Sequence, residues 1–232
     1  MTTAYNPELH PISTIVVADG VYAPQEDSQL LIDVMEEAGL AVGRTVADLC
    51  TGSGVVAINA AAQGASAVAA FDICQRAVRC ARSNALAHDV AVDVHLGSWA
   101  RAAEFGPFDL ITCNPPYVPH DPDNAAPTGV TGQARAWDAG EDGRMILDPL
   151  CAAAPDLLAD GGSLLLVQSE FANPRNTLAD LSAAGLDADI VAWQWVPFGP
   201  VLSSRAEWLE ETGRLEPGRR EEELLVIRAD KP

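Results

Sequence analysis

The stretch Asp109-Leu110-Ile111-Thr112-Cys113-Asn114-Pro115-Pro116-Tyr117 decides the fold. Its apolar part, Leu110 to Cys113, predicts a buried strand that ends abruptly in Asn-Pro-Pro-Tyr. A residue before proline is driven out of the α-helical region, and each proline fixes its own φ, so we expect a stiff, extended tip. The tip would present the Asn114 amide, the Pro115 carbonyl and the Tyr117 ring where open α/β sheets bind ligands, at the carboxyl ends of the strands.

Composition limits what kind of protein this is. The chain has 232 residues, 48% of them hydrophobic, which is enough for one large domain with a sizeable core. The formal net charge of -19 disfavours a generic nucleic-acid binder, because an acidic surface repels phosphate at long range. None of the five cysteines forms a Cys-x-x-Cys pair, so we expect no metal centre and no disulfide framework.

The start of the chain, Met1 to Pro7, has no basic segment followed by an apolar run, so we expect no signal peptide. We find no apolar stretch long enough to span a bilayer, and therefore expect no membrane partner. These features predict a cytoplasmic protein with reduced thiols.

Strand and helix patterns alternate along the chain. We expect strands at residues 45–49, 67–71, 90–96, 108–113, 163–168, 188–196 and 223–228, and helices at residues 29–36, 55–63, 75–87, 144–158 and 177–184. Such alternation predicts an α/β fold, with a mostly parallel seven-stranded sheet that carries helices on both faces.

Other segments give weaker signals. Residues 15–17 suggest a short strand, residues 118–142 a long functional loop, and residues 197–222 an excursion rich in Pro, Gly and charge. Asp27 or Ser28 could cap the first helix, and the Ser28 hydroxyl could equally contact a ligand. Trp193 and Trp195 alternate along a strand, which favours packing over recognition.

The turn Asp48-Leu49-Cys50-Thr51-Gly52-Ser53-Gly54 joins a strand to a helix. A dinucleotide fingerprint would need glycine at positions 50, 52 and 55, and only position 52 has it; a P-loop lysine is also absent. The turn is either an ordinary tight connection or a site where a ligand approaches the backbone. Asp48 could pair with an ammonium group, and Asp72, at the next strand end, could accept hydrogen bonds from vicinal ribose hydroxyls. S-adenosylmethionine has both groups.

The third strand ends in Leu96-Gly97-Ser98-Trp99, a position that would lie beside an adenine. Ser98 could bond the exocyclic amine, and Trp99 could line the ring pocket or simply be a core aromatic. In full, the residues expected to contact the cofactor are Ser28, Asp48, Cys50, Thr51, Gly52, Gly54, Asp72, Ile73, Ser98, Trp99 and Asn114.

Several motifs together carry a family resemblance. They are Val21-Tyr22-Ala23-Pro24-Gln25-Glu26-Asp27-Ser28, the 48–54 turn with Asp72, the Asn-Pro-Pro-Tyr tip, and Ala136-Trp137-Asp138-Ala139-Gly140-Glu141-Asp142-Gly143-Arg144. The chain resembles the S-adenosylmethionine-dependent protein methyltransferases of the HemK type, which modify the glutamine of the Gly-Gly-Gln loop in peptide-chain release factors. Cys50 replaces the first glycine of the turn, and Ser98 replaces an acid that is usual at the adenine position.

The resemblance covers nearly the whole chain. It implies a single Rossmann-like methyltransferase domain over residues 1–232, in which residues 1–43 form an N-terminal extension and helix, and residues 44–232 form the cofactor-binding and catalytic core. The short N-terminus resembles the eukaryotic and archaeal branch, which lacks the helical substrate-recognition domain of the bacterial enzymes. Members of that branch often work with a small zinc-binding activator subunit.

The resemblance implies that the tip motif serves transfer to a planar nitrogen, whose delocalised lone pair makes it a poor nucleophile. Asn114 and Pro115 would each accept one N–H of the target with a carbonyl oxygen, and Tyr117 would stack on the planar group. These three are the expected catalytic residues, and such positioning can contribute roughly 7–11 kcal/mol at its upper end.

The acceptor itself remains open between several classes. We expect a glutamine amide on a protein with a basic surface, a release factor being the leading candidate. The alternatives are an exocyclic amine of DNA or RNA, a small molecule of a biosynthetic pathway, and a non-catalytic cofactor-binding subunit. Acidity opposes the first of these, and the intact tip opposes the last. The acids Asp138, Glu141 and Asp142 are either a solvated loop, the default, or a surface for a basic partner.

Overall fold

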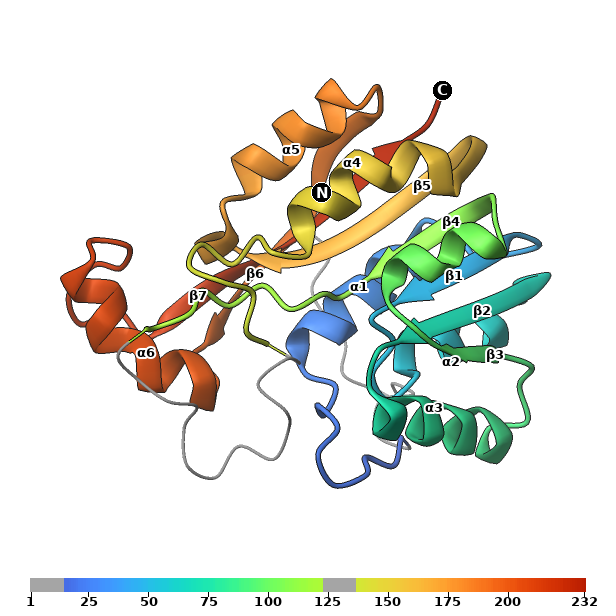
Figure 1. The fold of residues 1–232 in the computed structure, drawn as a ribbon, viewed down its shortest axis with the longest axis horizontal. Coiled ribbons are helices and arrows are strands. Elements are labelled where there is room, and N and C mark those ends of the chain that lie inside the picture. The colour runs from blue at the N-terminus through green and yellow to red at the C-terminus, as the bar shows by residue number, and fades with distance from the viewer. Residues whose placement is uncertain (1–14, 123–136) are drawn as a thin grey trace.

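The structure is a computed structural model that describes residues 15–122 and 137–232. Its centre is a seven-stranded sheet in the order β3-β2-β1-β4-β5-β7-β6 (Figure 1). The strands are β1 (Thr45–Leu49), β2 (Ala67–Asp72), β3 (Asp93–Leu96), β4 (Phe108–Cys113), β5 (Leu158–Ser169), β6 (Asp187–Pro197) and β7 (Glu221–Asp230). Pairing is parallel from β3 to β5 and antiparallel where β7 joins β5 and β6. The predicted mostly parallel seven-stranded sheet is confirmed.

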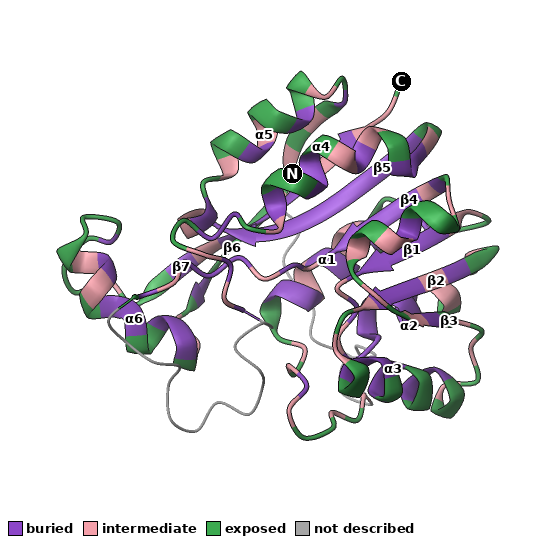
Figure 2. Cartoon of the chain, viewed as in Figure 1, coloured by how far each residue is buried: buried purple, intermediate pink, exposed green. Residues whose placement is uncertain are grey.

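Helices cover both faces of this sheet, as predicted. The α-helices are α1 (Glu26–Glu37), α2 (Val55–Ala62), α3 (Gln75–Ala87), α4 (Leu147–Leu157), α5 (Pro174–Ala183) and α6 (Pro200–Glu211), with short 3₁₀ helices η2 (Trp99–Glu104) and η4 (Glu170–Ala172). Successive strand residues point to opposite faces, so Ile111 and Leu164 enter one apolar cluster, and Leu110 and Leu165 enter the other. Figure 2 shows the resulting buried sheet between partly exposed helices.

The position of the site follows from the strand order. β1 pairs with β2 on one side and with β4 on the other, so the chain reverses its winding direction between β1 and β4. Such a switch point leaves a crevice at the carboxyl ends of the strands. Leu49 pairs with Cys113, so Cys50 and Asn114 leave the sheet side by side.

Two expectations about elements are wrong, and one helix lies where none is expected. Residues 15–17 form no strand; the Val16 N–H and carbonyl instead bond the side chain of Asn84 on α3. The 197–222 excursion contains α6, which begins at Pro200 because proline suits the first turn of a helix. Trp193 and Trp195 are 61% and 46% exposed on the edge strand β6, so they do not pack into the core.

Arg144 ties the entry of α4 to the neighbouring elements. The side chain is only 4% exposed, and its Nε donates to Asp148 Oδ1 at 2.7 Å. Nη1 donates to the Ala172 carbonyl (2.7 Å) and to Thr177 Oγ1 (2.9 Å), and Nη2 donates to Asp180 Oδ2 (2.8 Å). One guanidinium therefore joins α4, η4 and α5.

We expect Arg144→Met to lower the free energy of unfolding by about 2 kcal/mol or more, because the Ala172 carbonyl and the Thr177 hydroxyl each lose a buried donor and keep only a bond to Gln168, and two carboxylates lose their partner. Urea denaturation of the variant measures this loss. Arg175→Met, on the exposed side of α5, is the control and should leave the midpoint nearly unchanged. Equal midpoints for the two variants would show that the Arg144 contacts contribute little.

Candidate functional site

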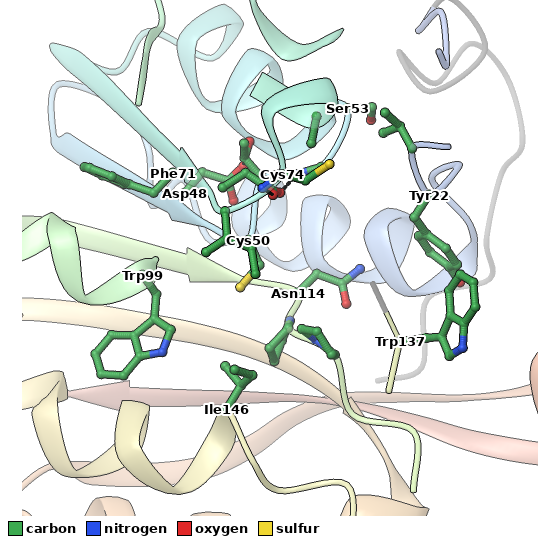
Figure 3. Close-up of a pocket in the computed structure, with 18 of the residues that line it drawn as sticks. Tyr22, Asp48, Cys50, Ser53, Phe71, Cys74, Trp99, Asn114, Trp137 and Ile146 are labelled. Carbon is green, nitrogen blue, oxygen red and sulfur yellow. Dashed lines mark hydrogen bonds between the residues drawn. The ribbon is translucent and has the colours of Figure 1, made fainter. Parts of the chain in front are cut away.

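A cavity of about 420 Å³ opens at the carboxyl ends of β1, β2 and β4 (Figure 3). All but one of the residues predicted to form the site line it. They are Ser28, Asp48, Cys50, Thr51, Gly52, Asp72, Ile73, Ser98, Trp99, Asn114, Pro115 and Tyr117. The crevice that the strand order creates is thus where the sequence motifs come together.

The Asn-Pro-Pro-Tyr tip is fastened to the first turn of α1. Asn114 Nδ2 donates to Ser28 Oγ at 3.2 Å, and the Tyr117 hydroxyl donates to Asp27 Oδ2 at 3.0 Å. With its nitrogen held, Asn114 offers Oδ1 as a hydrogen-bond acceptor at this end of the cavity. Burial, and secondarily the Asp27 charge, raises the pKa of Tyr117 well above its ordinary value, so this hydroxyl remains a donor.

The predicted capping role of Asp27 or Ser28 is wrong. The helix begins at Glu26 after an extended Gln25, so both residues lie inside its first turn. Their side chains turn toward the tip because the tip brings donors to them. Asp27 is therefore a residue of the site, although the sequence indicated it only as a cap and as part of the 21–28 motif.

Hydrogen bonds to the Asp48 carboxylate hold the turn that follows β1. This carboxylate is 1% exposed; Oδ2 accepts from the Thr51 hydroxyl at 2.5 Å, and Oδ1 accepts from the Thr112 hydroxyl of β4 at 2.8 Å. Burial raises the pKa of Asp48 to about 6 against these stabilising hydrogen bonds. Asp48 thereby links the turn to β4, the strand that precedes the tip. Its predicted pairing with an ammonium group stays a prediction.

Cys50 has a backbone conformation that glycine adopts most readily. Its φ is 58°, in the left-handed region, and Gly52 follows with φ of 56°. A side chain in this region costs about 1–2 kcal/mol. The turn therefore keeps the glycine-type backbone although the residue has changed, which leaves a thiol beside the cavity.

Asp72 braces the same turn from the neighbouring strand. Its Oδ2 accepts from the Gly52 N–H at 2.9 Å and its Oδ1 from the Cys74 N–H at 2.7 Å. Burial raises the pKa of Asp72, and these two N–H groups oppose that rise. Because a carboxylate has about four lone-pair positions, both oxygens can still accept a further hydrogen bond from a ligand.

Gly54 is the expected site residue that does not line the cavity. A Cβ atom there would lie 2.9 Å from Ala81 Cβ, so the glycine permits close packing of α3 instead. Ile73 is 55% exposed at the rim. Trp99 satisfies both of its interpretations, since it packs against the core and also faces the cavity.

A second cavity of about 420 Å³ adjoins the first, and Tyr117 lines both. The two share the wall formed by Val21, Tyr22, Asp27, Tyr117, Val118 and Trp137. Its floor includes Glu222 of β7, which is 7% exposed. Burial, followed by the charges of Asp27 and Glu170, raises the pKa of Glu222 to about 7.

Some site residues lay beyond the sequence motifs. Tyr22 and Trp137 lie within motifs named in the sequence analysis. No motif marked Ile146 or Glu222 as a site residue, because only the fold brings them to the cavities. Asp138 is no solvated acid: its Oδ2 lies 2.6 Å from His120 Nδ1. The rest of the predicted loop, residues 123–136, lies outside the described residues.

Two kinds of feature are absent from residues 15–122 and 137–232. No group of three or more His, Cys, Asp or Glu side chains there is arranged to hold a metal ion. No helix in the same ranges has both the length and the apolar composition needed to cross a membrane.

Known proteins resemble this chain in sequence. The family model described as "Methyltransferase small domain" matches residues 13–131. A putative protein N5-glutamine methyltransferase of Methanocaldococcus jannaschii is 32% identical over 182 residues, which cover 78% of this chain and 89% of that protein. A release factor glutamine methyltransferase of Rhodospirillum rubrum is 38% identical over 175 residues, 70% of this chain and 51% of that longer protein.

Solved structures share the fold. A chain of the E. cuniculi Mtq2-Trm112 complex, described as responsible for methylating the eRF1 translation termination factor, aligns with a TM-score of 0.61. The alignment covers 91% of this chain and 99% of that one at 22% identity, so this likeness concerns the fold alone.

We expect Glu222→Gln to stabilise the protein at pH 8 and to change it little at pH 4.5. The folded protein holds this proton up to about pH 7, whereas an unfolded Glu releases it near 4.5, so wild-type stability falls as the pH rises through that window. The gain at pH 8 is at most about 3 kcal/mol, or several degrees in Tm.

Thermal melts at the two pH values, with Glu221→Gln on the exposed side of β7 as the control, measure this effect. If wild type and Glu222→Gln differ in Tm by the same amount at both pH values, the buried carboxyl does not titrate in this range.

Proposed function

Because the chain belongs to the HemK-type methyltransferases, we propose that it transfers the methyl group of S-adenosylmethionine to the side-chain amide of a protein glutamine. The observation that carries this proposal is the fastened tip. In the structure Asn114 Nδ2 donates to Ser28 Oγ, which leaves Asn114 Oδ1 as an acceptor suited to an N–H of the target.

The first cavity fits the proposed cofactor. Asp72 would accept hydrogen bonds from the ribose hydroxyls, Gly52 would let the ligand approach the backbone, and Trp99 with Ser98 would receive the adenine. Ile73, Cys50 and Thr51 would complete the walls, with Asp48 beneath the turn. When bound, S-adenosylmethionine supplies an electrophilic methyl group on sulfur.

The tip would prepare the acceptor nitrogen. Asn114 Oδ1 and the Pro115 carbonyl would each accept one amide N–H, which places the nitrogen in line for transfer and favours its pyramidalisation. The Tyr117 ring, held through its hydroxyl by Asp27, would stack on the planar amide. No base is needed before transfer, because the proton becomes acidic only as the new N–C bond forms.

A protein acceptor suits the charge of this chain. The net charge of -19 favours a basic partner and opposes bare nucleic acid. The name of the R. rubrum relative and the description of the E. cuniculi complex both support a release factor as the substrate. The same complex supports a small activator subunit as a second partner.

We expect Asp72→Asn to weaken S-adenosylmethionine binding by roughly 10–150-fold, the equivalent of one charged hydrogen-bonded contact. Titration calorimetry measures the Kd. Asp187→Asn, exposed on edge strand β6, is the matched control and should bind like wild type. Equal affinity of Asp72→Asn and wild type would remove Asp72 from the cofactor site.

The acceptor is tested by presenting purified release factor, its Gln→Ala loop variant, duplex DNA and total RNA with labelled cofactor. Label should enter only the release factor that carries the glutamine. Asn114→Ala should cut this transfer about 100–1000-fold and weaken cofactor binding much less, since the positioned polar group that it removes acts chiefly on the acceptor nitrogen. Asn176→Ala, on the exposed side of α5, is the control.

The other outcomes of this assay would each point to a different acceptor. Label in a nucleic acid, or in the Gln→Ala variant, would refute the glutamine assignment. If no substrate is labelled, the assay is repeated with the small activator subunit added; continued absence of label would favour a small-molecule acceptor.

A further inference from the structure

The second cavity holds an acid whose carboxylate is incompletely satisfied. Glu222 Oε2 is buried, and it has no hydrogen-bond partner among residues 15–122 and 137–232. Only its link to the Ser169 side chain, at the end of β5, stabilises the charged form. Buried carboxylates are almost always paired, so an unpartnered carboxylate oxygen on a residue that lines a cavity indicates a missing ligand.

The charges that face Glu222 are negative. Glu26 and Asp27 of α1 and Glu170 of η4 all raise its pKa, and Glu222 in turn raises the pKa of Tyr22 and Tyr117. Glu170 already pairs with Arg219 at 3.0 Å. None of the described residues that line this cavity is Lys, Arg or His. A cation entering the cavity would therefore meet Glu26, Asp27 and Glu222, with no basic side chain among the described lining residues to offset them.

The remaining walls suit the rest of a long basic side chain. Val201, Leu202 and Leu224 provide apolar surface for an aliphatic stem, and Tyr22 and Trp137 add aromatic rings. Figure 3 shows Tyr22 and Trp137 on one side of Asn114 and Trp99 on the other. A segment whose acceptor residue reaches Asn114 would therefore pass the shared wall.

We propose that the second cavity is a specificity pocket for a basic side chain of the protein substrate, and that Glu222 is the residue that pairs with this side chain. The proposal rests on the function proposed above, in which the acceptor is part of a protein. Retaining a carboxylate here costs stability, which is typical of a group kept for binding.

A binding experiment tests the pocket without any methyl transfer. The probes are N-acetylarginine N-methylamide and its neutral analogue, N-acetylcitrulline N-methylamide, added to the full chain with ¹³C-labelled glutamate side chains and followed by NMR. At pH 8 the arginine probe should bind at least roughly tenfold more tightly than the citrulline probe and shift the Glu222 carboxyl resonance. This preference should shrink to near unity at pH 5.5, where Glu222 is protonated.

Variants locate the effect. Glu222→Gln should abolish the preference for arginine, and Glu221→Gln, one residue away on the exposed side of β7, should keep it. With release factor as substrate, Glu222→Gln should raise KM about tenfold and affect kcat much less. Equal binding of the two probes, no pH dependence, or equal behaviour of the two variants would overturn the proposal.

The two proposals fail in different ways. If glutamine methylation fails but the arginine preference depends on Glu222, the pocket stands and the acceptor assignment is wrong. If methylation succeeds and the probes bind equally, the pocket proposal is wrong and the proposed function stands.

Discussion

The site depends on two hydrogen bonds that join the tip after β4 to the first turn of α1. Asn114 donates to Ser28, and Tyr117 donates to Asp27, across 86 and 90 residues of sequence. Helix α1 can serve as a fixed anchor because Leu31 and Ile32 are fully buried against the sheet. Without that anchor, the Asn114 side chain could rotate and turn Nδ2 instead of Oδ1 toward the cavity. The amide of the proposed substrate also carries N–H groups, so it could not bond to Nδ2. The two prolines would still keep the backbone of the tip rigid, but the orientation of the Asn114 amide would not be defined.

Two buried carboxylates, Asp48 and Glu222, and the partly buried Asp72 differ in how many hydrogen bonds they receive, and this difference separates structural acids from acids that can bind a ligand. Asp48 is 1% exposed and accepts from two hydroxyls and from the Ala57 N–H, so it acts mainly on the turn, on β4 and on α2. Asp72 receives two backbone N–H groups and retains lone pairs that face the first cavity. Glu222 has an oxygen without a partner in the described part of the chain, and it floors the second cavity. Burial raises the pKa of all three, so burial alone does not identify a ligand site; the unfilled bonding positions do.

Sequence patterns predicted what is local. Alternating apolar runs indicated the sheet and its helices, and the prolines, the glycine turn and the acids at strand ends indicated the site. The misses have local causes as well. Helix α6 carried a usable signal, a proline at its first turn with Val201, Leu202, Ala206 and Leu209 buried along one face, but its polar flanks resembled a loop. Trp193 and Trp195 have the alternation of packed residues, yet β6 lies at the sheet edge, where the pattern does not guarantee a covering layer.

The sequence by itself therefore determined the class of fold, the stiff tip and most residues around the first cavity, because each of these depends on neighbours within a few positions or on the shared end of parallel strands. Only the tertiary structure decided that Ser28 and Asp27 hold the tip and that Gly54 serves packing against α3. It alone placed Glu222 beside Tyr22, because β7 inserts antiparallel between β5 and β6 and carries a residue from near the end of the chain to the first helix. The contacts of the tip span 86 and 90 residues, and Glu222 lies about 200 residues from Tyr22, so no local spacing encodes them.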